Sequence, residues 1–172
     1  PGHAEELMRE RSASQSDDDD HGIKDLTEYS AIVSIGGDGV VHEIMQGIHS
    51  RSDRAETLNR IKLGMVGTGT SNGLSATMAY ASDEKFSPID STFMIAKGTT
   101  SRMDLSHYET LSKSYTSFLT FTWGIIADID IESEAIHWMG FFRMDVWGAL
   151  RTLFLRRYRA KLWYRPPNLD AP

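Results

Sequence analysis

The stretch SIGGDGVVHEIMQG, residues 34–47, constrains the fold of this 172-residue chain more than any other. A β-branched run, AIVSI at 31–35, precedes the glycines and is typical of a buried strand. After the glycines, apolar residues recur at helical spacing, which predicts a helix over residues 40–49. A glycine-rich loop between a strand and a helix allows a backbone to approach a partner closely.

A second unit of the same kind follows. IKLGMV (61–66) predicts a strand, GTGTSNG (67–73) a turn, and Leu74 with Met78 the start of a second helix. SPIDSTFMIAKG (87–98) has a Ser/Asp cap and a terminal glycine, which predict a third helix. Strand–loop–helix units in series predict an α/β fold with parallel strands.

Changes in composition and pattern along the chain predict three segments. Residues 1–28 are acidic and predict a flexible segment with a possible helix at its start. Residues 29–98 hold the strand–loop–helix units of an α/β domain. From residue 99 on, TTSRMDLSHY and SYTSFLTFTWG predict strands, so 99–172 predicts a second, β-rich and incomplete domain.

Composition narrows the possible partners. The chain has no cysteine and a net charge of −6, which excludes disulfides and argues against nucleic acid. No apolar run reaches the length of a membrane span, and the charged start does not predict a secretory signal. Residues 151–165 nevertheless hold six basic residues and no acid, interleaved with aromatics. This pattern predicts either a solvated helix face or contact with an anionic membrane surface.

The two glycine loops are candidates for phosphate binding. Loops that follow parallel strands cluster at one edge of the sheet, and helix N-termini favour anions. GTGTSNG lacks the lysine of a P-loop and does not match G-x-G-x-x-G, so ordinary turn chemistry is an equal alternative. Asp38 is either a helix cap or a general base beside a bound phosphate. Glu43 lies about one turn further on and is expected to aim at the same site.

WGIIADIDIESE (123–134) is the other stretch with several side chains that could bind a ligand. Its four acids alternate with apolar residues, as at the edge of a strand with solvated carboxylates. The functional alternative is a carboxylate that binds a cationic or hydroxyl-bearing head group. Its apolar walls would come from Ile125, Ile126 and Ile129.

In order, GGDGVVHEIMQGI, GTGTSNGL, TWGIIADIDIESE and LRTLFLRRYRAKLWYRP resemble the sphingosine kinase branch of the diacylglycerol-kinase-type lipid kinases. The resemblance runs from about Tyr29 to Pro166. It implies a Rossmann-like, phosphofructokinase-like nucleotide-binding half followed by the start of a β-sandwich. It also implies ATP with Mg²⁺ in the cleft between them, a sphingoid-base substrate, and a cytoplasmic enzyme that is peripheral at membranes.

Matched by position, the resemblance makes Asp38 the catalytic base and Asp130 the acid that holds the sphingosine amine and hydroxyl. The nucleotide-contacting positions are Gly36, Gly37, Gly39 and Glu43 in the first loop, Thr68, Gly69, Thr70 and Asn72 in the second, and Glu134 and Arg143 further on. His137 stands where relatives carry a second phosphate-contacting arginine, and histidine is mostly neutral at pH 7.

The chain departs from the family pattern in ways that leave three hypotheses. Gly67 and Ser71 replace a proline and a glycine of the second loop, and the family's first and last motifs are absent. The chain is therefore expected to be the middle of a sphingosine kinase, itself inactive. The alternatives are a kinase for ceramide or diacylglycerol, and a non-catalytic fragment that binds nucleotide, lipid or a partner.

Overall fold

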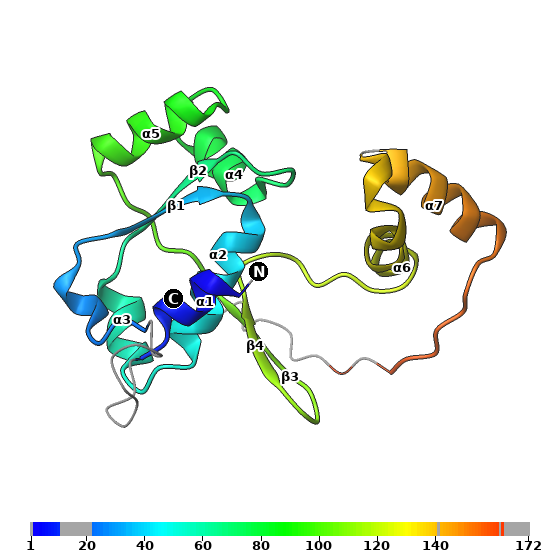
Figure 1. Ribbon diagram of the computed structural model, residues 1–172, viewed down its shortest axis with the longest axis horizontal. Coiled ribbons are helices and arrows are strands. Elements are labelled where there is room, and N and C mark those ends of the chain that lie inside the picture. The colour runs from blue at the N-terminus through cyan, green and yellow to red at the C-terminus, as the bar shows by residue number, and fades with distance from the viewer. Residues whose placement is uncertain (1, 11–21, 141, 162, 164–172) are drawn as a thin grey trace, which may run out of the picture. The chain divides into compact units, whose positions relative to one another are not determined.

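The computed structural model describes residues 2–10, 22–140, 142–161 and 163. Its contacts divide the chain into two compact units, residues 1–119 and 120–172. The first unit contains, in chain order, α1 (His3–Met8), the 3-10 turn η1 (Leu26–Glu28), β1 (Ile32–Gly36), α2 (Asp38–His49), α3 (Arg54–Arg60), β2 (Leu63–Gly67), α4 (Gly73–Ala81), α5 (Pro88–Lys97), β3 (Ser106–Glu109) and β4 (Ser114–Ser117) (Figure 1).

A parallel pair of strands organises the first unit. β1 and β2 align from Ile32 opposite Leu63 to Gly36 opposite Gly67. The two strands therefore end side by side, and the glycine loops that follow them start at the same edge. The strands and the helices that succeed them confirm the predicted α/β class.

Helices pack on both faces of this sheet. Ile32 and Leu63 face α2, where the core gathers, and Ile44 and Ile48 of α2 are at most 4% exposed. On the other face, α5 lies so close to β2 that a Cβ on Gly64 would meet Ile95 at 3.0 Å. Glycine at this position therefore sets the distance between α5 and the sheet.

An antiparallel hairpin, β3–β4, completes the first unit and is held by the C-terminal half of α2. The amide of Gln46 accepts from the N–H of Thr116 at 3.2 Å and donates to its carbonyl, as a neighbouring strand would. His49 Nδ1 lies 2.8 Å from the hydroxyl of the same threonine, which is 6% exposed. One helix thus carries the first glycine loop at its start and the hairpin near its end.

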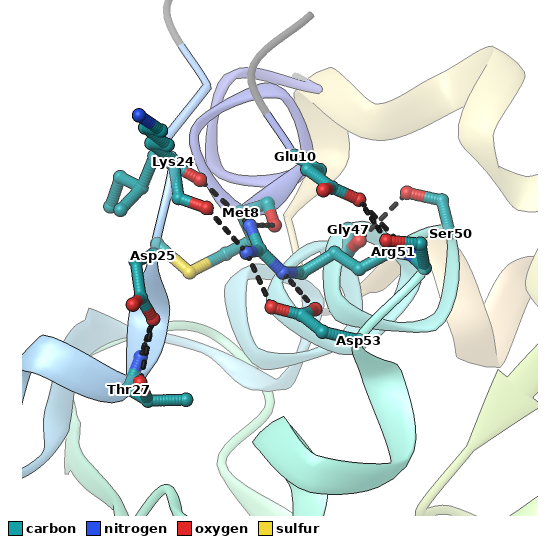
Figure 2. A network of polar contacts seen from close by, with 11 residues as sticks. Met8, Glu10, Lys24, Asp25, Thr27, Gly47, Ser50, Arg51 and Asp53 are labelled. Atoms are coloured by element: carbon teal, nitrogen blue, oxygen red, sulfur yellow. Dashed lines mark hydrogen bonds and ion pairs between the residues drawn. The ribbon is translucent and has the colours of Figure 1, made fainter.

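Arg51, which follows α2 and is 2% exposed, ties the N-terminal segment to this unit (Figure 2). Its Nε and Nη2 donate to the two carboxylate oxygens of Asp53 at 2.7 and 2.9 Å. Its remaining N–H groups donate to the carbonyls of Ile23 at 2.7 Å, Lys24 at 2.9 Å and Met8 at 3.4 Å. All five donors of the buried guanidinium are therefore satisfied.

The second unit is helical in the part that the structure describes. It contains α6 (Ile125–Ser133), the 3-10 segment η2 (Glu134–Met139) and α7 (Phe142–Leu153). Ile129 of α6 packs beside Gly148 of α7, and the buried Ser133 hydroxyl contacts the sulfur of Met144. Glu132 joins the same two helices by accepting from Trp147 Nε1 at 2.8 Å.

Two features of the second half differ from the sequence-based expectation. The alternating acids of 123–134 predicted a strand edge, but this stretch forms α6. Ile129 and Ser133, four residues apart, pack against Gly148 and Met144 of α7. The strand predicted from SYTSFLTFTWG (114–124) forms only over Ser114–Ser117.

The domain boundary predicted near residue 99 stays a prediction. The hairpin that follows it packs on α2 of the first unit. The predicted helix near the start corresponds to α1, whereas residues 12–20 lie outside the described part of the chain. In that described part, no helix is long and apolar enough to cross a membrane.

Replacement of Arg51 by methionine is expected to lower the free energy of unfolding by about 3 kcal/mol, because it leaves buried carbonyls and Asp53 without donors. Arg60→Met is the matched control, since its ion pair with Glu56 is exposed; it should change stability by less than about 0.5 kcal/mol. Urea unfolding followed by circular dichroism measures both. Equal midpoints for the two variants would contradict the structural role of Arg51.

Candidate functional site

The loops after β1 and β2 are bonded to each other by their backbones. The N–H of Thr68 donates to the carbonyl of Gly36, and the N–H of Asp38 donates to the carbonyl of Ser71, both at 3.0 Å. The first bond continues the register of the strands beyond the sheet, and the second joins the start of α2 to the end of the second loop. The two predicted phosphate loops therefore form one continuous surface feature, as parallel strand topology predicts.

Two of the loop glycines are required by this contact. A Cβ on Gly69 would lie 2.4 Å from the Cα of Gly37, and a Cβ on Gly37 would lie 2.8 Å from the carbonyl oxygen of Ser71. Neither neighbour is the flexible end of a side chain, so any larger residue would separate the loops. Packing of loop on loop is thus sufficient to explain Gly37 and Gly69 without a ligand.

Gly39 lies in a different environment. A Cβ there would meet nothing within 4 Å, and the residue sits in the first turn of α2 with ordinary helical geometry. Internal packing therefore gives no reason for glycine at this position. Open space beside the N-terminus of a 12-residue helix is where an anionic ligand approaches most easily.

Asp38 is buried, at 7% exposed, and its carboxylate joins the two loops. Its Oδ2 accepts from the N–H of Gly73 at 2.6 Å, and its Oδ1 accepts from the N–H of Leu74 at 3.1 Å. Although Asp38 is the first residue of α2, it thus satisfies free N–H groups at the start of α4. Asp38 thus acts as a helix cap, but it caps α4 rather than α2, the helix that it begins.

The second loop is closed by Asn72. Its Oδ1 accepts from the N–H of Gly69 at 2.9 Å, and its Nδ2 donates to the carbonyl of the same residue at 2.6 Å. Both hydrogen-bonding ends of the amide are occupied inside the loop. The predicted contacts Thr68 and Thr70 lie on the same loop with exposed side chains, where their hydroxyls are accessible to a ligand.

Glu43 points to another part of the molecule. Its carboxylate accepts from the N–H groups of Gly2 at 2.9 Å and Ala4 at 3.2 Å, at the start of α1. The hydrogen bond from Gly2 holds the pKa of Glu43 below its ordinary value. The expectation that Glu43 aims at the phosphate loops is therefore not met in the structure.

In the second unit, the predicted residues are distributed over α6, η2 and α7. Glu134 and Arg143 form an ion pair with each other. Asp130 is exposed on α6, and none of the described residues hydrogen-bonds its carboxylate. Ile126 is 58% exposed, while Ile125 and Ile129 are half-buried, with Ile129 against α7.

Metal ligands are not concentrated anywhere in the described residues. No group of three or more His, Asp or Glu side chains there is arranged to bind an ion. Asp38 is the carboxylate at the glycine loops, and both its oxygens already accept N–H bonds. The loops fit phosphate through backbone and hydroxyl groups, whereas a Mg²⁺ ion would have to bring most of its ligands as phosphate and water oxygens.

Sequence comparison agrees with this geometry. The family model for the diacylglycerol kinase catalytic domain matches residues 1–108, and the chain belongs to this family. Among curated proteins it is 32% identical to sphingosine kinase 1 of Arabidopsis thaliana over 148 residues, 86% of this chain and 30% of that protein. It is also 32% identical to human sphingosine kinase 1 over 170 residues, 95% of this chain and 41% of that protein. The chain thus spans less than half the length of these relatives.

Removal of the Asp38 carboxylate is expected to destabilise the first unit. Asp38→Ala should lower the free energy of unfolding by about 2 kcal/mol, because the N–H groups of Gly73 and Leu74 lose their acceptor. Asp38→Asn should cost less, since the amide oxygen still accepts from one of them. Asp104→Ala, at an exposed aspartate, is the control and should cost under about 0.5 kcal/mol. Denaturant unfolding that ranks Asp104→Ala with Asp38→Ala would contradict the capping role.

Proposed function

We propose that the protein carrying this chain is a lipid kinase that transfers the γ-phosphate of ATP to the primary hydroxyl of a sphingoid base. The observation that carries the proposal is the joined pair of glycine loops with open space at Gly39, in a chain of the diacylglycerol kinase catalytic domain family. The names of the relatives, sphingosine kinases of plants and animals, supply the substrate class.

In this proposal, the phosphates lie against the N-terminus of α2 and the exposed hydroxyls of Thr68 and Thr70. Asp38 accepts the proton of the attacking hydroxyl as the new O–P bond forms and ADP leaves. Each carboxylate oxygen has a second lone pair, so this role is compatible with capping α4. Mg²⁺, when bound with ATP, would neutralise charge on the phosphates.

An acid of α6 is proposed to select a cationic lipid. Sphingosine carries an ammonium, whereas diacylglycerol and ceramide do not, so a carboxylate in the lipid site distinguishes the classes by charge. The resemblance assigns this role to Asp130, which lies exposed on α6. The family name keeps diacylglycerol as the second candidate substrate.

Phosphate transfer from radiolabelled ATP to a lipid panel tests the function, with Gly39→Ala as the diagnostic variant. Sphingosine should be the preferred acceptor over ceramide and diacylglycerol. Gly39→Ala should not lower stability, because alanine is favoured over glycine in a helix, but it should raise the KM for ATP on the order of tenfold through the added methyl group. Preference for a neutral lipid, or an unchanged KM in a folded variant, would overturn the proposal.

Peripheral membrane contact is proposed for the basic tract, of which the structure describes residues 151–161 and 163. Arg157, Arg159 and Lys161 are exposed there, beside Phe154 at 69% and Trp163 at 81% exposure. Basic and aromatic side chains in one exposed stretch favour an anionic lipid surface. A cytoplasmic enzyme would meet its lipid substrate at such a surface.

Binding to phosphatidylserine vesicles is therefore expected to weaken on the order of tenfold in the double variant Arg157→Gln/Arg159→Gln, and to fall with added salt. The charge-matched control is Arg102→Gln/Lys113→Gln, two exposed residues of the first unit, which should bind like the unmodified chain. Vesicle co-sedimentation measures both. Salt-insensitive binding, or equal losses in the two double variants, would contradict membrane contact through this tract.

A further inference from the structure

The hairpin β3–β4 is docked on α2 through a small contact. Of the residues in its two strands, Thr116 is the one that is buried. The backbone of Thr116 is paired with the amide of Gln46, and its hydroxyl lies 2.8 Å from His49 Nδ1. The tip of the hairpin extends away from the sheet of the first unit (Figure 1). A segment with so little buried surface separates from its support at a lower free energy than the core opens.

A second histidine lies beside this contact. The ring centroid of His107, on β3, is 5.0 Å from that of His49, and the two rings are inclined by 39°. One imidazole belongs to the helix and the other to the hairpin, so separation of the hairpin from α2 also separates the rings. Two positive charges this close repel each other. Protonation of both histidines therefore acts directly against docking.

No negative group offsets this repulsion at His49. Burial of the imidazole, and then the positive charges of His107 on β3 and Arg54 on α3, hold the pKa of His49 below its ordinary value. The carboxylate of Glu109 lies 3.3 Å from His107 Nε2, on the hairpin itself. It is exposed to water, where an ion pair contributes little, so it compensates only a small part of the repulsion.

The sign of the pH dependence follows from these causes. Once the hairpin leaves, His49 is exposed to water and returns to the ordinary histidine pKa of about 6.5. The docked state therefore binds fewer protons, and docking weakens as the pH falls through about 6.5 toward the lowered pKa. The hydrogen bond to Thr116 does not oppose this change, because a hydroxyl can donate to a neutral Nδ1 or accept from a protonated one.

The position of the hairpin also affects the glycine loops. Leu119 lies two residues after β4, and its N–H donates to the hydroxyl of Ser117 at 3.1 Å. A Cβ on Gly73 would meet Leu119 Cδ2 at 3.8 Å, so the leucine lies beside the first residue of α4. The N–H of Gly73 is one of the two that Asp38 accepts. Docking of the hairpin thus places Leu119 beside the cap that joins the two loops.

We propose that His49 and His107 form a pH-sensitive switch, which keeps the hairpin β3–β4 on α2 at neutral pH and releases it in mild acid. Release also removes Leu119 from the start of α4, so the N-terminus of that helix becomes more accessible at the same pH. The switch lies within the first unit and does not depend on the proposed kinase function.

Hydrogen–deuterium exchange followed by mass spectrometry tests the switch between about pH 7.5 and 5.5, with correction for the intrinsic exchange rate at each pH. Protection of residues 114–119 should fall on the order of tenfold toward the acidic end, because protonation favours the released hairpin. Protection of β1 in the same sample should change by less than about twofold, since the strand stays within the core.

Three variants identify the titrating groups. His49→Asn does not titrate, and its amide oxygen can accept from Thr116 in place of Nδ1, so its hairpin protection should vary by less than about twofold. His42→Asn, at an exposed histidine of the same helix, is the matched control and should keep the full change. His107→Asn removes the second charge, leaves the Thr116 contact intact and should reduce the pH dependence.

Circular dichroism at both pH values checks that each variant is folded, and the exposed His107 position decides the matter if His49→Asn is not. Constant protection of the hairpin across the pH range would overturn the proposal. Full pH dependence in a folded His49→Asn or His107→Asn variant would do the same, as would its loss in His42→Asn. Equal loss of protection in β1 and in the hairpin would show unfolding of the whole unit rather than release, and would also overturn it.

Discussion

The two hydrogen bonds that the N-terminus of α4 donates to Asp38 are the constraint on which the loop arrangement depends. They join the first residue of α2 to the first turn of α4, and so fix the end of β1 against the end of β2. A buried carboxylate is stable there because a helix N-terminus supplies free N–H groups and a favourable dipole. With this anchor in place, Gly37 and Gly69 can remain in contact, and the open space at Gly39 keeps its position.

This arrangement changes how Asp38 is to be understood. The residue that the resemblance makes a base is also the link between the two loops, so a substitution there alters both proton transfer and the shape of the phosphate surface. Loss of activity in an Asp38 variant therefore has two physical origins. Gly39 separates them, because its side chain position is open and its replacement disturbs no internal contact. Variants at both positions, compared with each other, therefore distinguish loss of proton transfer from a change in the shape of the phosphate surface.

Sequence reasoning succeeded where periodicity carries the structure and missed what depends on backbone partners. The strands before the glycines and the helices after them followed from apolar spacing, and the meeting of the loops followed from parallel topology. The partners of Asp38, and all those of Arg51 except the Asp53 carboxylate, are backbone N–H and carbonyl groups, which every residue carries and no sequence pattern reveals. Helix α3 was missed although Asp53 and Glu56 give the spacing of a helix start. The prediction that Glu43 aims at the loops was wrong, because a position one helical turn along α2 does not specify which neighbour the carboxylate contacts.

The acids of α6 show how secondary structure decides chemistry. On a strand, Asp128, Asp130, Glu132 and Glu134 would all lie on one face, because side chains two apart point the same way. On a helix they separate into two pairs. Asp128 and Glu132 accept from tyrosine, tryptophan and arginine donors of α7 and the segment after it, whereas Glu134 pairs with Arg143. Matching motifs along the chain cannot distinguish Asp128 from Asp130, since both belong to the same run of acids. Their hydrogen-bond partners and burial do distinguish them: Asp128 is half-buried and accepts from the hydroxyl of Tyr158, whereas Asp130 is exposed.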